Sequence, residues 1–337
     1  MEKPDFFIIG IVKVPAVTVF AIEEPEISPV NPEPRIALSY NLRSDLAMKA
    51  SFATMNQYVH LLSTSGVGLP TDLWVPATEK VKPQNSQQVA AGIAKDFEKQ
   101  NFSLTVEGYY KTMNNIVGYK EGASFLAIQD GVDGAESISW EDNITSGKGV
   151  SYGGEFLVQR KQGKLTGWVG YTLSWTTQQF DELNNGNKFF ARYDRRHDIS
   201  VVGIYELKEN ITLSATWVYG TGNAITLPLS TYELGSLNNS RYGEQFGFNR
   251  SGTEYTARND FRMRSYHRAD IGIQVSKEKK RGVRTWEFSA YNFYNRKNPF
   301  YYTIGPEKKF DPDSKQVLKQ ISLFPILPSV SWNYKFK

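Results

Sequence analysis

The feature that most constrains this chain is an alternation of apolar and polar side chains with a period of two residues. In 211–219, for example, Ile211, Leu213, Trp217 and Tyr219 share one face, and hydroxyl side chains occupy most of the other. Successive side chains of a β-strand point to opposite faces of a sheet, so this pattern predicts strands. It recurs in eleven segments: 35–42, 46–54, 87–97, 102–111, 150–162, 165–176, 196–207, 211–219, 267–276, 283–295 and 329–336. The chain is therefore predicted to be all-β.

Composition excludes several classes of protein. The 337 residues include no Cys, which removes disulfides and thiol chemistry, and the formal charge of +4 comes without a basic stripe, so no nucleic-acid partner is expected. The mean hydropathy is -0.44, and the chain lacks the run of roughly 20 apolar residues that a membrane-spanning helix needs. A spanning β-strand needs only about 10 residues of alternating polarity, and the 46 aromatic residues (19 Tyr, 20 Phe, 7 Trp) suit the girdles of a membrane barrel.

The connections between the predicted strands alternate in length. Short polar connections lie at 43–45, 98–100, 162–164, 208–210 and 277–282. Long ones lie at 55–86, 113–149, 177–195, 220–266 and 296–316. Strict alternation is typical of an antiparallel transmembrane β-barrel, which has tight turns at one rim and long loops at the other. A large soluble β-protein is the competing interpretation, but it would scatter its long crossings and would have to pair every charged residue of the polar faces in a dry core.

The last predicted strand carries a more specific signal. It ends in an alternating run of apolar side chains, one residue before the terminal Lys337: Val330, Trp332, Tyr334 and Phe336. This run resembles the terminal assembly signal by which the barrel-assembly machinery recognises bacterial outer-membrane proteins, although Lys337 departs from the pattern. The competing interpretation is an ordinary amphipathic last strand.

Several short motifs carry a wider resemblance. They occur in this order along the chain: SFATMNQY at 51–58, GGE at 153–155, YDRRHD at 193–198, YHRAD at 266–270 and YNFYNRKNP at 291–299. From about residue 34 onward the chain resembles the C-terminal half of the β-barrel of a TonB-dependent outer-membrane receptor, of the kind found in Bacteroidetes. The resemblance implies that the eleven strands are the last half of a 22-strand barrel, and that the plug domain and the segment that contacts TonB are absent.

The resemblance divides the chain into a non-barrel segment, 1–34, and a part of the receptor barrel, 35–337. The first segment makes a poor secretion signal, because Glu2 precedes the apolar run and Lys13 interrupts it. Our hypothesis is that this segment arises from a displaced start or a frameshift in a longer receptor gene.

The resemblance also implies a function. Such a receptor lies in the outer membrane in contact with its lipid, is inserted by the barrel-assembly machinery, and takes up a small or oligomeric nutrient with energy from the TonB complex. Because the TonB-contacting region is missing, we expect this chain alone not to transport under energy control. A passive outer-membrane porin is the second hypothesis and an outer-membrane barrel enzyme the third. The sequence does not choose among siderophores, oligosaccharides, cobalamin-like compounds and peptides as substrates.

The richest candidate binding segment is the long connection 220–266. Its aromatic and arginine side chains are of the types that stack on ligand rings and pair with ligand carboxylates or phosphates, although they would also pack on one another. The candidates are Tyr232, Arg241, Tyr242, Phe246, Phe248, Arg250 and Tyr255, together with Arg258.

Other polar clusters predict no chemistry. In 194–198 (DRRHD) adjacent side chains alternate between faces, so His197 cannot share a side with both neighbours, and we expect ion pairs at the outer rim instead of catalysis. The acidic pairs Asp130 with Asp133 and Asp311 with Asp313 supply too few ligands for Ca²⁺. We therefore expect no enzyme activity, no metal and no cofactor.

Overall fold

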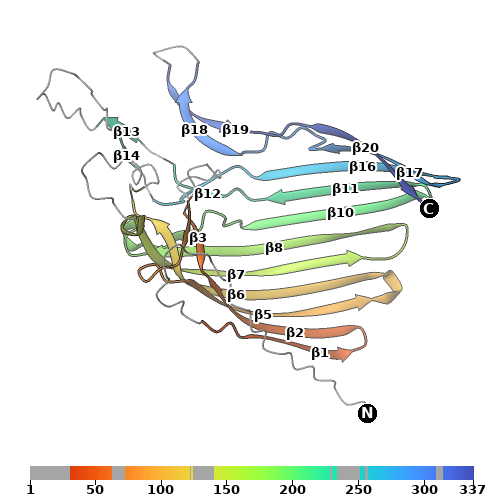
Figure 1. Ribbon diagram of the computed structural model, residues 1–337, viewed down its shortest axis with the longest axis horizontal. Coiled ribbons are helices and arrows are strands. Elements are labelled where there is room, and N and C mark those ends of the chain that lie inside the picture. The colour runs from red at the N-terminus through yellow and green to blue at the C-terminus, as the bar shows by residue number, and fades with distance from the viewer. Residues whose placement is uncertain are drawn as a thin grey trace, which may run out of the picture.

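One large antiparallel sheet dominates the computed structural model (Figure 1). The structure describes residues 31–62, 73–121, 123, 140–227, 230–233, 251–254, 257–308 and 314–337. The main path of the sheet runs through eleven strands in chain order: β1 (Arg35–Arg43), β2 (Leu46–Gln57), β5 (Gln84–Phe97), β6 (Phe102–Tyr119), β7 (Ile144–Arg160), β8 (Leu165–Phe180), β10 (His197–Lys208), β11 (Ile211–Gly220), β16 (Tyr266–Lys279), β17 (Gly282–Tyr291) and β20 (Leu327–Phe336). All eleven predicted strands are confirmed. A short strand, β9 (Phe189–Phe190), adds to β8.

The five short connections lie together at one end of the sheet, which we call the turn rim, and the long connections lie at the opposite end, the outer rim (Figure 1). The strands reach further toward the outer rim than the sequence predicts, most clearly in β6, which continues to Tyr119. The end of one predicted strand is wrong. The strand was predicted over 283–295, but in the structure it ends at Tyr291. The backbone turns there, because Asn292 and Asn295 adopt left-handed φ angles of 49° and 54°.

Small hairpins decorate the outer rim within the described residues. They pair β3 (Val59–Leu62) with β4 (Leu73–Pro76), β12 (Ala224–Ile225) with β15 (Phe261–Arg262), β13 (Ser230–Glu233) with β14 (Ser251–Glu254), and β18 (Tyr301–Pro306) with β19 (Gln316–Ile321). The part of the chain that the structure describes also has three single-turn 3₁₀ helices: η1 (Glu98–Gln100), η2 (Trp140–Asn143) and η3 (Asn184–Gly186). No helix in the described part of the chain is long and apolar enough to cross a membrane.

The strand register keeps the two faces of the sheet chemically distinct. Ile273 lies opposite Phe288, and Phe288 lies opposite Val330, whereas on the other face Gln274 lies opposite Glu287. The same apolar set continues across the sheet to Ile36 on β1. The shifts of register lie toward the rims, between Asn41 and Arg43, between Glu206 and Lys208 and between Met113 and Ile116. The apolar face is therefore continuous over all eleven strands.

Much of this apolar face is open to solvent. Ile36 is 56% exposed, Phe288 is 46% exposed and Val330 is 61% exposed, so no layer of protein covers the strands there. Among the described residues, two clusters of buried apolar side chains lie instead near the outer rim, around Leu62 and Phe180. An exposed apolar face this large requires an apolar environment or partner.

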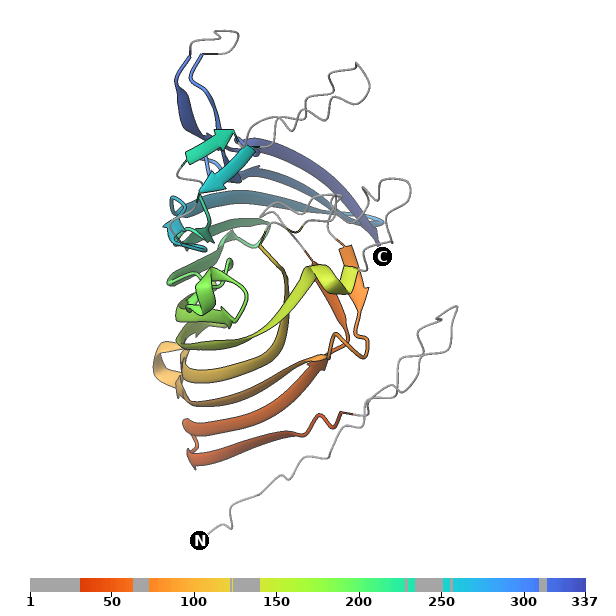
Figure 2. The ribbon, with the colours of Figure 1, turned by 90° about the vertical axis from the view of Figure 1, so that its left-hand side faces the viewer.

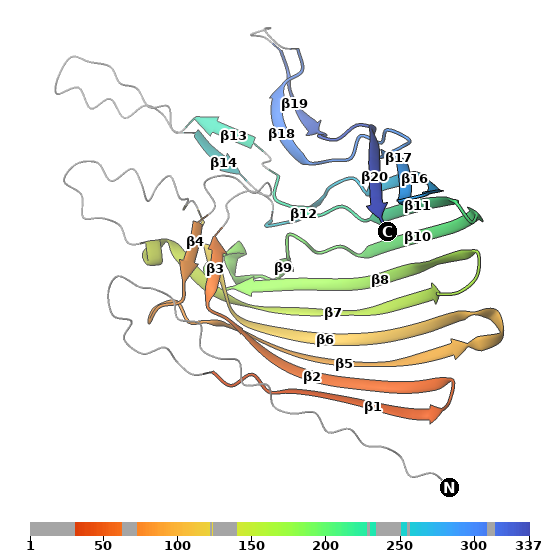
Figure 3. The same ribbon diagram turned by 45° about the vertical axis from the view of Figure 1, so that its right-hand side comes forward.

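The sheet curves into an open arch, seen end-on from the outer rim in Figure 2, and hairpin β3–β4 lies on its concave side. Figure 3 shows the meander of strands from a third side. Among the described residues β1 pairs only with β2, and β20 pairs only with β17, so both are edge strands. Because ten antiparallel pairings separate them, β1 and β20 run in the same direction, toward the turn rim.

The proposed boundary between the N-terminal segment and the barrel falls at the start of the described residues. Residues 1–30 lie outside them. The Pro34 carbonyl accepts a hydrogen bond from the Thr54 amide at 2.9 Å, and the Glu33 carboxylate accepts one from the Asn56 amide at 2.7 Å. The last residues before β1 thus run beside β2, and the division at residue 34 stays a prediction.

Candidate functional site

Hairpin β3–β4 is held to the outer rim by an apolar cluster. Leu62 and Val75 from the hairpin pack with Tyr119 at the end of β6 and Ile144 at the start of β7. A bulge between Met113 and Ile116 of β6 precedes this contact. Bulges increase the twist and bend of a strand, and Figure 2 shows the outer ends of the yellow strands curving across the arch.

His60 of the same hairpin is the most enclosed titratable group of this cluster. Its side chain is 3% exposed, and its Nε2 atom is buried without a hydrogen-bond partner. Burial lowers the pKa of His60 below its ordinary value, because the charged imidazolium loses its solvation. The imidazole is thus held in its neutral form.

A second apolar cluster anchors the connection between β8 and β10. Phe180 at the end of β8 stacks on Phe189 of β9 with ring centroids 6.0 Å apart, and Leu183 is buried beside them at 1% exposure. Gly147 lies under the Phe180 ring, and a Cβ atom there would come within 2.6 Å of it. Glycine at position 147 therefore allows the Phe180 ring to pack against the β7 backbone.

Asp194 is the electrostatic centre of the outer rim. Its side chain is fully buried, and it accepts a hydrogen bond from the Thr176 amide at 2.6 Å. It also pairs with Arg196 at 3.5 Å and more closely with Arg262 of β15. Arg262 further donates to the Asp194 carbonyl at 2.5 Å. One carboxylate therefore joins the connection before β10 to a segment nearly 70 residues later.

The predicted ion pairs in 194–198 are confirmed, and they are joined by partners that the sequence pattern did not reveal. Arg195 pairs with Asp198 at 3.4 Å and donates to Asn223 at 3.1 Å. His197 lies apart from them and contacts the Tyr171 hydroxyl through Nδ1 at 2.9 Å. Arg262 and Asn223 were missed because only the folded connection brings them to the cluster.

Residues 257–260 contact the connection between β8 and β10. The Arg258 amide donates to Asn184 at 3.0 Å, and the Asn259 side chain donates to the Phe190 carbonyl at 2.9 Å. The Arg258 guanidinium lies 5.5 Å from the centre of the Phe189 ring. Burial lowers the pKa of Arg258, and the negative charge of Glu121 partly opposes that effect. Arg258 thus contacts the preceding connection, at Asn184 and Phe189.

The remaining candidates of the loop are not described at the level of side chains. Tyr232 lies in β13, for which only the backbone is described. The others lie outside the described residues: Arg241, Tyr242, Phe246, Phe248, Arg250 and Tyr255. Their role in binding stays a prediction.

Two rings that the sequence did not single out as binding residues are well placed at the outer rim. Trp74 of β4 is 65% exposed, and Tyr193, next to buried Asp194, is 75% exposed. Both are carried by segments that the apolar clusters and the Asp194 ion pairs hold in place. Exposed rings on a fixed support can stack on a ligand with little loss of conformational entropy.

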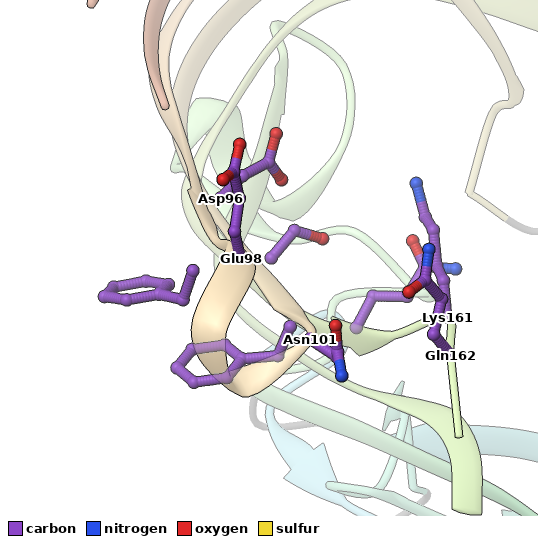
Figure 4. A pocket seen from close by; sticks show the side chains of 9 residues that line it. Asp96, Glu98, Asn101, Lys161 and Gln162 are labelled. Carbon is purple, nitrogen blue, oxygen red and sulfur yellow. The ribbon is translucent and has the colours of Figure 1, made fainter. Parts of the chain in front are cut away.

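The turn rim carries a polar groove of about 370 Å³ between two hairpins (Figure 4). Asp96 and Glu98 lie on the side of the β5–β6 turn, and Lys161 and Gln162 lie across from them on the β7–β8 turn. The Asn101 backbone closes the first turn with a left-handed φ of 57°. The groove presents charges of both signs.

Within the described ranges, no three metal-ligating side chains come together. The acidic pairs Asp130 with Asp133 and Asp311 with Asp313 lie outside those ranges. The expectation that neither binds Ca²⁺ therefore stays a prediction.

Comparison with known proteins identifies the architecture. No protein-family model and no curated protein matches the chain. Among solved structures, the ferric citrate transporter FecA in its unliganded form aligns with a TM-score of 0.50 and 10% identity, over 90% of this chain and 38% of that one. The pyoverdine outer-membrane receptor FpvA from Pseudomonas aeruginosa PAO1, bound to pyoverdine, aligns with a TM-score of 0.50 and 12% identity, over 89% of this chain and 36% of that one.

Both proteins are transport receptors of the TonB-dependent class, and this chain spans little more than a third of the length of either. The antiparallel strand order, the continuous apolar face and the long connections gathered at one rim agree with that architecture. The chain has the fold of part of the barrel wall of a TonB-dependent outer-membrane receptor.

Proposed function

We propose that this chain forms part of the barrel wall of an outer-membrane receptor, and that its outer rim contributes to capturing a nutrient for TonB-dependent uptake. The apolar face contacts lipid, the polar face lines the lumen, the outer rim faces the exterior and the turn rim faces the periplasm. Insertion requires the barrel-assembly machinery. Contact with the TonB complex belongs to the receptor as a whole and is not assigned to these residues.

The continuous apolar face is the single observation that carries the proposal. Across the eleven strands, apolar side chains lie opposite one another on one face of the sheet. The other face carries polar side chains such as Glu107, Glu155 and Gln274. In a transmembrane barrel the outward face meets hydrocarbon and the inward face meets water. A soluble sheet would need a second layer over the exposed apolar face to offset its contact with water.

The structure of the outer rim favours a role in binding a nutrient over a purely structural role as barrel wall. Its segments are interlocked by buried groups, Asp194 above all, and they expose Trp74 and Tyr193 on a fixed frame. The fold neighbours are a ferric citrate transporter and a pyoverdine receptor, whose ligands are small molecules. We infer a small-molecule nutrient, captured by ring stacking and by the arginines of the outer connections.

The absence of Cys from the chain allows a clean test of orientation. Tyr193→Cys places one thiol at the outer rim, and Lys161→Cys places one at the turn rim. In intact cells that export the chain to the outer membrane, a membrane-impermeant maleimide is expected to label Tyr193→Cys. It should label Lys161→Cys only after the outer membrane is permeabilised. Labelling of Lys161→Cys alone in intact cells, or of neither variant before lysis, would contradict the proposal.

Solute flux separates the receptor from the passive porin. The exported chain is purified from the outer membrane together with any barrel partner and placed in liposomes for a swelling assay. A receptor wall whose lumen is normally occupied is expected to give no sustained flux of small sugars. Rapid, unenergised flux through a closed barrel would overturn the receptor assignment in favour of a channel.

A further inference from the structure

Positive charge gathers at one corner of the turn rim, where the turn between β16 and β17 lies beside the end of β20 (Figure 1). Residues 277–284 hold five cationic side chains and one carboxylate, whereas each of the other four short connections holds at most one more cation than carboxylates. The Lys337 amide donates to the Arg281 carbonyl at 3.1 Å, which fixes the end of β20 against this turn. The corner is therefore the most basic part of the turn rim.

Strand register sorts these charges between the two faces of the sheet. Lys277 lies opposite Arg284, and Arg284 lies opposite Tyr334 of β20, so these three side chains share the apolar face. The next row points to the polar face, and it carries Glu278 on β16 and Lys335 on β20. The one carboxylate of the turn thus lies on the face opposite to Lys277 and Arg284.

Lys277 and Arg284 form a like-charged pair without a counter-charge. Like charges directly opposite each other on neighbouring strands repel. Among the described residues neither side chain makes an ion pair, and the Arg284 Nε atom is covered by protein without a hydrogen-bond partner. At the turn between β1 and β2, by contrast, Arg43 pairs with Asp45 at 3.1 Å. An anion that binds from outside would relieve the repulsion between Lys277 and Arg284.

This pair lies where the apolar face of the sheet ends. Two residues nearer the outer rim, about 7 Å along the strands, the same face carries Trp286 opposite Trp332. The Tyr334 ring stacks on Trp332 with centroids 6.3 Å apart. Trp and Tyr side chains gather at membrane interfaces because one end of each ring is apolar and the other is polar. A group held by Lys277 and Arg284 would have an apolar surface on one side and water on the other.

We propose that this corner is a binding site for an anionic phospholipid of the periplasmic leaflet, whose headgroup phosphate lies between Lys277 and Arg284. The inference rests on the proposed function, which places the apolar face in lipid and the turn rim at the periplasmic side. A guanidinium forks onto phosphate oxygens, and an ammonium adds a point charge. Phosphatidylglycerol carries a net negative charge, whereas phosphatidylethanolamine carries its own ammonium, which the two cations would repel.

An acidic periplasmic protein is the alternative occupant, and the position of the cations argues against it. Such a protein would approach from the water beyond the turns. Lys277 and Arg284 instead share their face with Trp332 and Tyr334, on the side of the sheet that the proposed function places against lipid.

The test uses the exported chain, purified from the outer membrane with any barrel partner and placed in vesicles of phosphatidylglycerol and phosphatidylethanolamine in equal amounts. After extraction into a mild detergent, mass spectrometry measures the ratio of the two lipids retained per chain. The native chain is expected to retain phosphatidylglycerol preferentially. Lys277→Gln and Arg284→Gln should each lower this preference by about fivefold, since one cation near an anionic membrane lipid typically contributes that much.

Lys335→Gln is the matched control. It removes one cation from the same corner but from the polar face, so it should leave the preference for phosphatidylglycerol unchanged. Protease protection of each variant in the vesicles is measured in parallel and is expected to match that of the native chain, because all three positions lie at the rim.

The outcomes separate the site from the proposed function. Loss of the preference in Lys277→Gln and Arg284→Gln, but not in Lys335→Gln, supports the site. Equal retention of the two lipids by an inserted native chain overturns it, as does an equal loss in all three variants. Displacement of phosphatidylglycerol by a soluble hexaglutamate peptide would assign the cations to an acidic protein and also overturns it. If the native chain is not protected from protease in vesicles, the proposed function itself fails.

Discussion

At the scale of single residues, the outer rim is organised by a few buried polar groups in an otherwise open structure. Asp194 has no exposed side-chain surface, and His60 is 3% exposed, yet each lies in a connection and not in the body of the sheet. A buried charge without partners is strongly unfavourable, so Asp194 holds its arginines and its amide donor together. The positions of the exposed rings depend on these groups.

Replacing Asp194 is expected to loosen two distant segments together. Asp194→Ala leaves Arg262 and Arg196 without their shared partner and frees the Thr176 amide. Allowing for the partial exposure of both arginines, the local free energy of opening should fall by about 2 kcal/mol. Hydrogen exchange of 181–196 and 257–265 should accelerate in parallel.

Asp198→Ala is the matched control for this change. Its pair with Arg195 is almost half exposed, so its loss should cost less than about 1 kcal/mol. Equal effects of the two variants, or faster exchange in 181–196 alone, would contradict the central role of Asp194.

His60 should make hairpin β3–β4 sensitive to acid. Its pKa is lowered in the folded state, so the folded hairpin favours the neutral ring. The stabilising contribution is complete above the unfolded pKa of about 6.5 and is lost as the pH falls through the lower folded value. Hydrogen exchange in 59–62 and 73–76 should therefore accelerate, relative to its intrinsic rate, as the pH falls below about 6.5. His60→Leu should abolish that pH dependence, and an unchanged profile in this variant would show that another group is responsible.

At the scale of elements, the strands are specified by local pattern and the connections by distant contacts. The last strand illustrates the first case. Val330, Trp332 and Phe336 lie on the apolar face and are 61%, 54% and 77% exposed, whereas Ser331 and Asn333 lie on the other face. Tyr334 pairs with Arg284 in the same apolar register. This arrangement agrees with the predicted assembly signal without testing it.

If the last strand is an assembly signal, substitutions on its apolar face should impair insertion and substitutions on its polar face should not. Trp332→Ser and Phe336→Ser should slow insertion by the barrel-assembly machinery severalfold, because they remove apolar side chains from the recognised face. Asn333→Ser, on the polar face of the same strand, should insert as the native chain does. Acquisition of heat-modifiable electrophoretic mobility in membranes measures the rate. Similar rates for all three variants would leave an ordinary amphipathic strand as the explanation.

The sequence predicted these strands because period-two patterning is a local property. It predicted the end of 283–295 wrongly, since the alternation continues past Tyr291 while the left-handed turn at Asn292 redirects the backbone. It identified the 194–198 ion pairs but not Arg262, which joins them only through the folded connection.

At the scale of the whole molecule, the arch has two faces and two open edges. Its outer edges, β1 and β20, run in the same direction within the described sheet. Completion by antiparallel pairing at both edges therefore needs an odd number of further strands, which brings the total to an even number. The chain spans little more than a third of the length of these two fold neighbours.

The central claim is that the apolar face meets lipid while the polar face meets water. Accessibility of single cysteines on neighbouring positions tests it most directly. Ile273 and Phe288 lie opposite each other on the apolar face, and Gln274 and Glu287 lie opposite each other on the polar face. All four are exposed in the protein alone, so lipid is what should distinguish them.

In lipid vesicles, a water-soluble maleimide is expected to label Gln274→Cys and Glu287→Cys at least about tenfold faster than Ile273→Cys and Phe288→Cys, since hydrocarbon excludes the charged reagent. In urea all four variants should react at the same rate. Alternating rates in vesicles would confirm that this sheet is a membrane wall. Equal rates for the two faces in vesicles, or faster labelling of the apolar face, would contradict the account.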